Sequence, residues 1–255
     1  MMKTILILLV LVSPAVAQKP PLQTGRQVFV DFRKERNLPS PKISAATERM
    51  VLSKMFRKYL TDQNRCNQNF NAGNNSDYLA AARKAGEIVP SIYTVATGSF
   101  TAAGQQQTLY LVSVSECNAS HADAFGTKRV AIFNGQQLIA DVDINFKDNI
   151  QLKTDLNGDG IDELLLSSVD QHQGTIEEMA TLVSFQNGRL QVVHDFGLVL
   201  EDSCANLMPG SASKASVLYT TAGAPGTMPN FTMENYQAGC NRAKRWRLIS
   251  RGKME

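Results

Sequence analysis

The stretch TDLNGDGIDELLLSS, residues 154–168, places acidic and amide side chains at alternate positions in front of an apolar run. Calcium prefers oxygen ligands, and a short loop can supply them at alternate positions around a glycine that allows a sharp turn. Five residues would supply these ligands, at positions 1, 3, 5, 7 and 9 of the loop: Asp155, Asn157, Asp159, the carbonyl of Ile161, and Glu163. The spacing therefore predicts one calcium site.

Two other interpretations of this loop explain less of it. An EF-hand needs a bidentate Glu at position 12, but that position is Leu166, and no helical pattern flanks the loop. A plain polar turn, in which Asx residues hydrogen-bond to their own backbone, accounts for one or two such residues. It does not account for four at ligand spacing, so we favour metal binding.

Catalytic chemistry has weaker support, because the chain has only three histidines: His121, His172 and His194. His172 follows the apolar run closely and has Asp170 as a neighbour, so a hydrolase could use these two residues together with Asp155. No G-x-S-x-G, H-E-x-x-H or Cys–His signature supplies a nucleophile or a positioned base. We therefore assign no catalytic residue, and we leave enzymatic activity open while favouring its absence.

An internal repeat supplies the elements that would position the loop. GSFTAAGQQQTLYLVSV (98–114) aligns with TDLNGDGIDELLLSSV (154–169) at an offset of 56 residues, and AIFNGQQLIADV (131–142) aligns with SFQNGRLQVVHDF (184–196) at an offset of 53. The Asn134-Gly135 and Asn187-Gly188 pairs predict hairpins in which both turn residues have positive φ. A weaker third copy begins near Ser211. Repeats of this length with several antiparallel strands are typical of propeller blades.

The loop and the strand after it resemble the FG-GAP or VCBS-type repeat, the blade of integrin-like β-propellers. The pattern of that repeat is D-x-[DN]-x-D-G-x-x-[DE]-L, and six residues match it: Asp155, Asn157, Asp159, Gly160, Glu163 and Leu164. The resemblance implies calcium binding in a loop between blades. The first copy keeps the glycine but not the carboxylates, so it is not expected to bind calcium; its equivalent residues are Ser99, Thr101, Ala103, Gly104 and Gln107.

The repeats set the expected fold, which is mainly β with an N-terminal helical segment. Residues 91–255 accommodate three units, at about 91–146, 147–205 and 206–255, whereas family propellers commonly close with seven. We therefore expect antiparallel blade-like repeats in an incomplete propeller, with a small β-sandwich as the alternative. An unclosed array leaves strand edges, and an amphipathic helix predicted over 44–61 is available to cover them.

The N-terminal third divides into three segments. Residues 1–17 have the apolar run and small residues of a secretory signal peptide, too short to span a membrane. Residues 18–43 form a Pro-rich tether that contains a short strand-like stretch, Gln27–Phe32. Residues 44–90 are expected to be helical, with Ser44 as an N-cap. Removing the leader from the 255 residues leaves 238, enough for a substantial core.

Four cysteines, Cys66, Cys117, Cys204 and Cys240, in an exported chain predict two disulfides. Four cysteines allow three pairings, which the sequence cannot distinguish; pairing 204 with 240 and 66 with 117 would keep each loop within neighbouring elements. Asn-x-Ser/Thr triplets begin at three further positions and matter only in a eukaryotic source: Asn74, Asn118 and Asn230.

The net charge of +3 and the lack of a strongly basic face argue against a nucleic-acid partner. The basic residues near the C-terminus alternate with Trp246, Leu248 and Ile249, a pattern typical of an edge strand with charged outward positions. We therefore expect a secreted or periplasmic monomer with no membrane span after the leader. Its expected role is that of a non-enzymatic binding or scaffold module for a protein or glycan, with calcium as the one cofactor; the alternative is the secreted hydrolase.

Overall fold

The computed structural model describes residues 25–34, 42–61, 78–117, 127–145, 147, 149–206, 210–224, 226–241 and 245–253. Two α-helices and twelve β-strands form within these ranges, and the strands pair in antiparallel fashion throughout. The expected mainly-β architecture with an N-terminal helical segment is confirmed. The described strands do not close into a barrel.

The first unit is a four-stranded sheet in which each strand pairs with the next along the chain. Its strands are β2 (Ile88–Gly98), β3 (Gln107–Glu116), β4 (Thr127–Asn134) and β5 (Gln137–Asp143). β2 is an edge strand, and it contains Pro90 because an edge position does not need every backbone N–H for pairing.

The second unit repeats this order and forms one half of an eight-stranded sheet. Its strands are β6 (Asn149–Thr154), β7 (Glu163–His172), β8 (Thr175–Ser184) and β9 (Gln191–Asp202). The loop 155–162 connects β6 to β7, just as residues 99–106 connect β2 to β3. The two connections that align in the sequence are therefore equivalent in the fold.

The third unit forms the other half of the eight-stranded sheet and takes one strand from the N-terminal part of the chain. Its strands are β1 (Gln27–Asp31), β10 (Ala212–Thr221), β11 (Asn230–Gly239) and β12 (Arg247–Lys253). β1 pairs with the second half of β10, while β9 pairs with β10 at only three residues, Ser213–Ala215. The strand expected within Gln27–Phe32 is thus present and completes a four-stranded unit.

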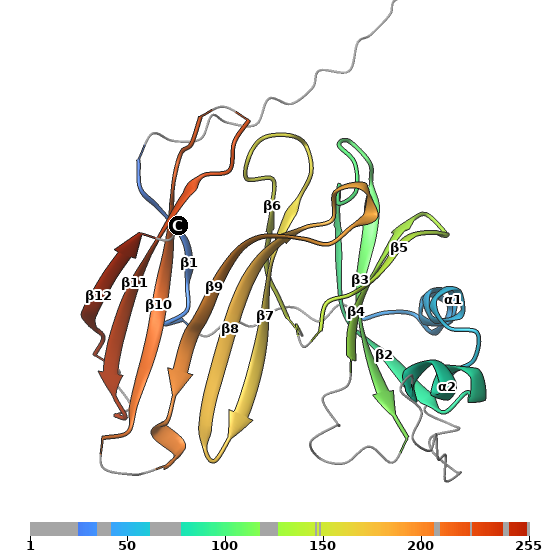
Figure 1. The fold of residues 1–255 in the computed structure, drawn as a ribbon, viewed down its shortest axis with the longest axis horizontal. Helices are drawn as coiled ribbons and strands as arrows, with labels where there is room; N and C mark the ends of the chain where they lie inside the picture. The colour runs from blue at the N-terminus through green and yellow to red at the C-terminus, as the bar shows by residue number, and fades with distance from the viewer. Residues whose placement is uncertain are drawn as a thin grey trace, which may run out of the picture.

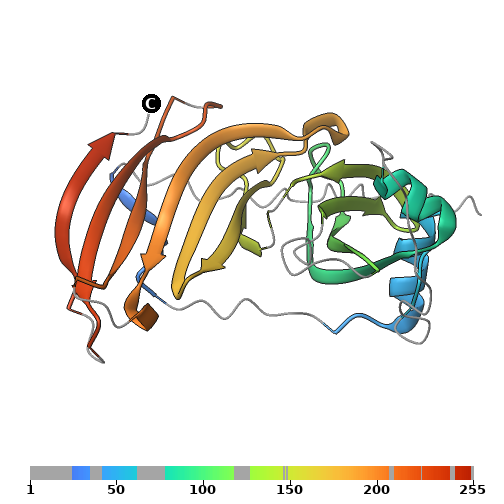
Figure 2. The same ribbon diagram turned by 60° about the horizontal axis from the view of Figure 1, so that its bottom comes forward.

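The three units pack face to face, with the second unit in the middle (Figures 1 and 2). Leu164 and Leu166 of β7 enter a core shared with the first unit, whereas Leu165 enters a core shared with the third. A strand covered on both faces needs no polar alternation, which explains the unbroken Leu run.

The two helices cover the outer face of the first unit. α1 (Ala45–Met55) begins at Ser44, whose Oγ accepts a hydrogen bond from the N–H of Thr47 at 3.1 Å, and α2 (Tyr78–Ala85) is followed by Gly86 at φ 78°. The apolar pattern predicts a helix over 44–61, but α1 ends at Met55 because the backbone of Phe56 is extended. Val51, Leu52, Phe56 and Ala82 pack against β2, β3 and β4, so the helices cover a sheet face and not an edge.

The two predicted hairpins differ in their turns. Asn187 and Gly188 both have positive φ, 57° and 72°, as the Asn-Gly pair predicts. In the first unit Asn134 remains in β4 and pairs with Gln137, so the turn shifts by one residue and only Gly135 has positive φ. The prediction that both Asn134 and Gly135 adopt positive φ is therefore wrong, although the hairpin itself forms.

A disulfide joins Cys204, just after β9, to Cys240, just after β11, and so ties the end of the second unit to the third. Cys117 is also disulfide-bonded. Cys66 lies outside the described residues, as do the leader 1–17, most of the tether, the sequons at Asn74 and Asn118, and His121. Asn230 is exposed at the start of β11.

Candidate metal centre

The predicted metal loop runs from the end of β6 to the start of β7, and Glu163 is the first residue of β7. Two glycines let this loop turn sharply, Gly158 at φ 78° and Gly160 at φ 84°. Residues with a side chain avoid this left-handed region, so glycine is the natural choice at both positions.

The polar side chains of the loop fold back onto its own backbone. Asp155 accepts hydrogen bonds from the N–H groups of Gly158, at 2.7 Å, and Gly160, at 3.2 Å. Asp159 accepts one from the N–H of Ile161 at 2.7 Å and one from the side-chain amide of Asn157 at 3.0 Å. These bonds hold two carboxylates and one amide on the same small loop.

Glu163 lies beneath this loop and is only 1% exposed. Its Oε2 accepts a hydrogen bond from the N–H of Leu156 at 2.8 Å. Burial raises the pKa of Glu163 to about 7, and repulsion from Asp159 and Asp155 adds to this effect, while the hydrogen bond from Leu156 opposes it. Three carboxylates are therefore close enough to interact around a poorly solvated point.

The equivalent loop of the first unit also has a buried side chain that accepts backbone hydrogen bonds, but that side chain is neutral. Gln107, 56 residues before Glu163, is also 1% exposed. Its Oε1 accepts hydrogen bonds from the N–H groups of Phe100, at 2.8 Å, and Thr101, at 2.9 Å. Its Nε2 donates to the Thr101 hydroxyl at 2.6 Å. The neutral amide of Gln107 both accepts and donates, so it alone provides hydrogen-bond partners for the backbone N–H groups and the hydroxyl at the centre of this loop.

The two loops also contact each other. The N–H of Ser99 donates to Oδ2 of Asp162 at 2.9 Å, and the N–H of Asp162 donates to the carbonyl of Ser99 at 2.7 Å. A Cβ at Gly98 would lie 2.3 Å from the same Asp162 oxygen, and a Cβ at Gly160 would lie 2.9 Å from that of Ala103. The predicted metal loop is therefore part of the contact between the first and second units.

The chemistry of the loop fits calcium, which takes about six to eight oxygen ligands in flexible geometry. Carboxylate, amide and carbonyl oxygens are all available between Asp155 and Glu163. Within the described ranges, however, no group of three or more His, Cys, Asp or Glu side chains is arranged to hold a metal ion. In this arrangement the carboxylates bind N–H groups of their own loop, so ligation would redirect oxygens that now accept hydrogen bonds.

The candidate catalytic residues are not brought together. Nδ1 of His172 lies 3.6 Å from Oδ2 of Asp170, but both side chains are more than half exposed. They lie at the far end of β7 from Asp155, and a ten-residue strand is about 30 Å long. His194 packs against the rings of Phe196 and Phe231, with centroids 4.6 and 5.2 Å away. The described residues of the hydrolase hypothesis therefore do not form one site.

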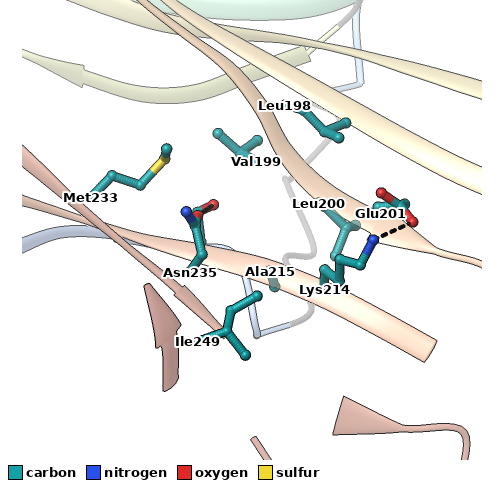
Figure 3. A pocket seen from close by; sticks show the side chains of 10 residues that line it. Leu198, Val199, Leu200, Glu201, Lys214, Ala215, Met233, Asn235 and Ile249 are labelled. Atoms are coloured by element: carbon teal, nitrogen blue, oxygen red, sulfur yellow. Dashed lines mark hydrogen bonds and ion pairs between the residues drawn. The ribbon is translucent and has the colours of Figure 1, made fainter. Parts of the chain in front are cut away.

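A groove that the sequence did not predict lies between β9 and the face of the third unit (Figure 3). Its volume is about 220 Å³, and one end carries the ion pair between Lys214 and Glu201 at 3.0 Å. Its walls are mostly apolar; the lining residues are Leu198, Val199, Leu200, Glu201, Lys214, Ala215, Ser216, Met233, Asn235 and Ile249. These residues come from four strands, so no local sequence pattern marks the groove.

A second feature that the sequence missed is a buried carboxylate on the opposite face of the third unit. Glu234 is 2% exposed, and it accepts hydrogen bonds from the hydroxyls of Tyr219 and Tyr236. Its Oε1 is paired with Arg26 at 2.9 Å and with Arg251 at 2.7 Å. The hydrogen bond from Tyr236 is the main cause that lowers the pKa of Glu234 to about 2.

Comparisons with protein families, with curated proteins and with solved structures find no match for this chain. Neither helix in the described part of the chain has the length and apolarity needed to cross a membrane.

Proposed function

We propose that this chain is a secreted or periplasmic, non-enzymatic binding or scaffold module, stabilised by one calcium ion in the loop from Asp155 to Glu163. One comparison carries the calcium part of the proposal. Glu163 and Gln107 accept the same hydrogen bond in equivalent loops, from Leu156 and Phe100, but the second loop has carboxylates where the first has neutral groups. The neutral loop has no charge to compensate, whereas the charged loop brings together carboxylates that repel one another and would gain from a cation.

The ion would be held by the side chains of the loop and by one backbone carbonyl; these ligands are Asp155, Asn157, Asp159, the carbonyl of Ile161, and Glu163. Bound calcium would neutralise the buried carboxylate and link the start of β7 to the loop above it. The resemblance to FG-GAP or VCBS-type repeats supports this assignment, because it implies calcium binding in this loop and its pattern matches four of the ligands: Asp155, Asn157, Asp159 and Glu163. The ion's role here is structural.

Two observations support an exported binding module over a hydrolase. The disulfide between Cys204 and Cys240, with Cys117 also oxidised, is typical of an oxidising compartment and agrees with the leader expected at 1–17. The separation of Asp155 from His172 and Asp170 leaves the hydrolase hypothesis without an assembled site among the described residues. The module would therefore act through its surfaces.

Thermal unfolding of the expected exported form, residues 18–255, tests the calcium site. A ligand that binds only the folded state at ten times its Kd stabilises it by about 1.4 kcal/mol. For a chain of this size that raises the Tm by about 3–5 °C. We expect this rise on replacing chelator with millimolar calcium, and we expect it to disappear in Asp159→Asn.

The matched control is Asp170→Asn, which removes the same charge from an exposed position at the other end of β7. This control should keep the calcium response. Extracellular calcium modules bind at about 0.1–1 mM. No change in Tm of the parent chain at about 10 mM calcium would exclude the site.

A further inference from the structure

β12 (Arg247–Lys253) is an edge strand whose side chains are exposed along most of its length. Among the described strands it pairs only with β11, and every residue from Arg247 to Gly252 is exposed. Leu248 and Ile249 are adjacent apolar residues on this edge and are 44% and 53% exposed. An open, partly apolar edge strand presents unpaired N–H and C=O groups to which another strand can add.

The charge of this edge selects among possible partners. Arg245, Arg247 and Arg251 are all exposed, and the sequence from Arg245 to Lys253 contains no acidic residue. Arg251 shares the buried carboxylate of Glu234 with Arg26, so one negative charge faces two positive ones. Two copies of this edge would place like charges opposite each other, which is unfavourable, whereas an acidic strand would be attracted.

The groove lies beside the same edge. Ile249 of β12 lines the groove together with Leu198 of β9 and Met233 of β11 (Figure 3). Ser216 and Asn235 of its lining belong to a hydrogen-bonded row, in which the Ser216 hydroxyl donates to Asn235 at 2.7 Å and the Asn235 amide donates to the Ser250 hydroxyl of β12 at 2.9 Å. The pairing of β12 with β11 is irregular beside Ile249, which is skipped in the register, so Ile249 and Arg251 lie on opposite faces although they are two residues apart. Because successive side chains of a regular strand point to opposite faces, an added strand would direct alternate residues to the groove and to the face that carries Arg251.

We propose that the open edge of β12 binds an extended peptide segment of a partner protein in which acidic and apolar residues alternate. The backbone of the peptide adds a strand to β12, its apolar side chains enter the groove beside Ile249, and its carboxylates pair with Arg251 and the basic residues near it. This inference rests on the binding part of the proposed function and names the class of partner. It does not depend on calcium, because β12 belongs to the third unit and the metal loop to the second.

Fluorescence anisotropy with a labelled peptide of about eight alternating Glu and Val residues, the length of a typical strand, tests the inference. We expect residues 18–255 to bind this peptide saturably, and more weakly as salt increases. Binding should weaken by about tenfold in Arg251→Gln and in Ile249→Ser, since each removes one of the two kinds of contact. A peptide of alternating Lys and Val should not bind.

The matched control is Arg189→Gln, at an exposed position in the turn between β8 and β9, which should bind as the parent chain does. Ile249→Ser changes an exposed side chain, so it keeps the test valid even if loss of Arg251 from the Glu234 cluster disturbs folding. Equal binding of the Lys and Val peptide, or unchanged binding in Ile249→Ser, would overturn the inference. A dimer of the parent chain that Ile249→Ser dissociates would also overturn it, in favour of a second copy.

Running the titration in calcium and in chelator separates the two proposals. Peptide binding without any calcium response of the Tm would overturn the metal site alone. A calcium response without peptide binding would overturn the β12 inference alone.

Discussion

Gln107 in the first unit and Glu163 in the second occupy equivalent positions: each accepts a hydrogen bond from the backbone N–H seven residues earlier, at 2.8 Å in both loops. An amide can also donate, and Gln107 does so to Thr101. An ionised carboxylate cannot donate, so whenever Glu163 is ionised its loop has no hydrogen bond equivalent to the one that Gln107 donates. The two loops thus share this backbone hydrogen bond, but a neutral amide accepts it in the first unit and a carboxylate accepts it in the second.

Replacing Gln107 with Leu should destabilise the protein by about 2–4 kcal/mol, because the N–H groups of Phe100 and Thr101 would be buried without an acceptor. Urea unfolding measures this loss. Gln106→Leu makes the same change at an adjacent exposed position and should cost less than about 0.5 kcal/mol. Similar losses in the two variants would contradict the role given to Gln107.

Replacing Glu163 with Gln should have opposite consequences with and without calcium. In chelator the variant should be at least as stable as the parent chain, because Gln keeps an acceptor for Leu156 and removes a buried charge that Asp155 and Asp159 repel. In calcium it should be the less stable of the two, since one ligand charge is gone. Melting curves in both buffers check this, and a clear loss of stability in chelator would show that the carboxylate is not under repulsion.

Adding a methyl group at Gly98 should separate the first two units. The new Cβ would meet Asp162, so Gly98→Ala should break the paired hydrogen bonds between Ser99 and Asp162 and cost about 2 kcal/mol or more. Gly239→Ala is the control, because a Cβ there has no neighbour within 4 Å. Chemical denaturation of both variants measures the difference, and equal stabilities would argue against this contact.

Stability should fall in acid partly because Glu234 becomes protonated. Its pKa of about 2 in the folded protein lies below the value of 4.5 expected when unfolded, so its ionised form stabilises the fold above pH 4.5 and this contribution is lost as the pH falls toward 2. Glu234→Gln should lower the free energy of unfolding at pH 7 by about 2–3 kcal/mol. It should also flatten the dependence on pH between 4.5 and 2.

The control for this titration is Glu48→Gln, at an exposed position in the first turn of α1. This variant should leave the fall in the free energy of unfolding between pH 4.5 and 2 unchanged. A profile of Glu234→Gln that runs parallel to that of the parent chain would contradict the assignment.

Reducing the disulfide between Cys204 and Cys240 should loosen the third unit. The cysteines are 36 residues apart, and a closed loop of that length stabilises the folded state by about 4 kcal/mol through the entropy of the unfolded chain. The double variant Cys204→Ser, Cys240→Ser should therefore lose about 8–16 °C of Tm in calorimetry. An unchanged Tm would mean that the third unit is held without this link.

The sequence predicted those parts of the fold whose physical cause is local. Ser44 caps α1 because its hydroxyl reaches a nearby N–H, and the Leu run of β7 is buried on both faces, as its lack of polar alternation indicates. The alignment of 98–114 with 154–169 placed Gln107 and Glu163 in equivalent positions. Local periodicity failed at the end of α1, where apolar residues continue past Met55 in an extended segment that packs on the first unit.

The features that were missed depend on residues far apart in the chain. Asp162 binds Ser99, 63 residues away, and Glu234 binds Arg26, 208 residues away. The groove combines side chains from four strands. None of these contacts leaves a period or a motif, because their partners are set by how the units stack and not by neighbouring residues.

The pairing of β1 with β10 has a consequence for the order of folding. The first and second units are built from consecutive hairpins, so each can form from a short stretch of chain. Gln27 pairs with Thr220, however, so this strand has no partner until nearly the whole chain is present. Closing so long a loop is entropically costly and slow compared with local hairpin formation. The third unit should therefore form last, with a segment near the start of the chain as its final strand.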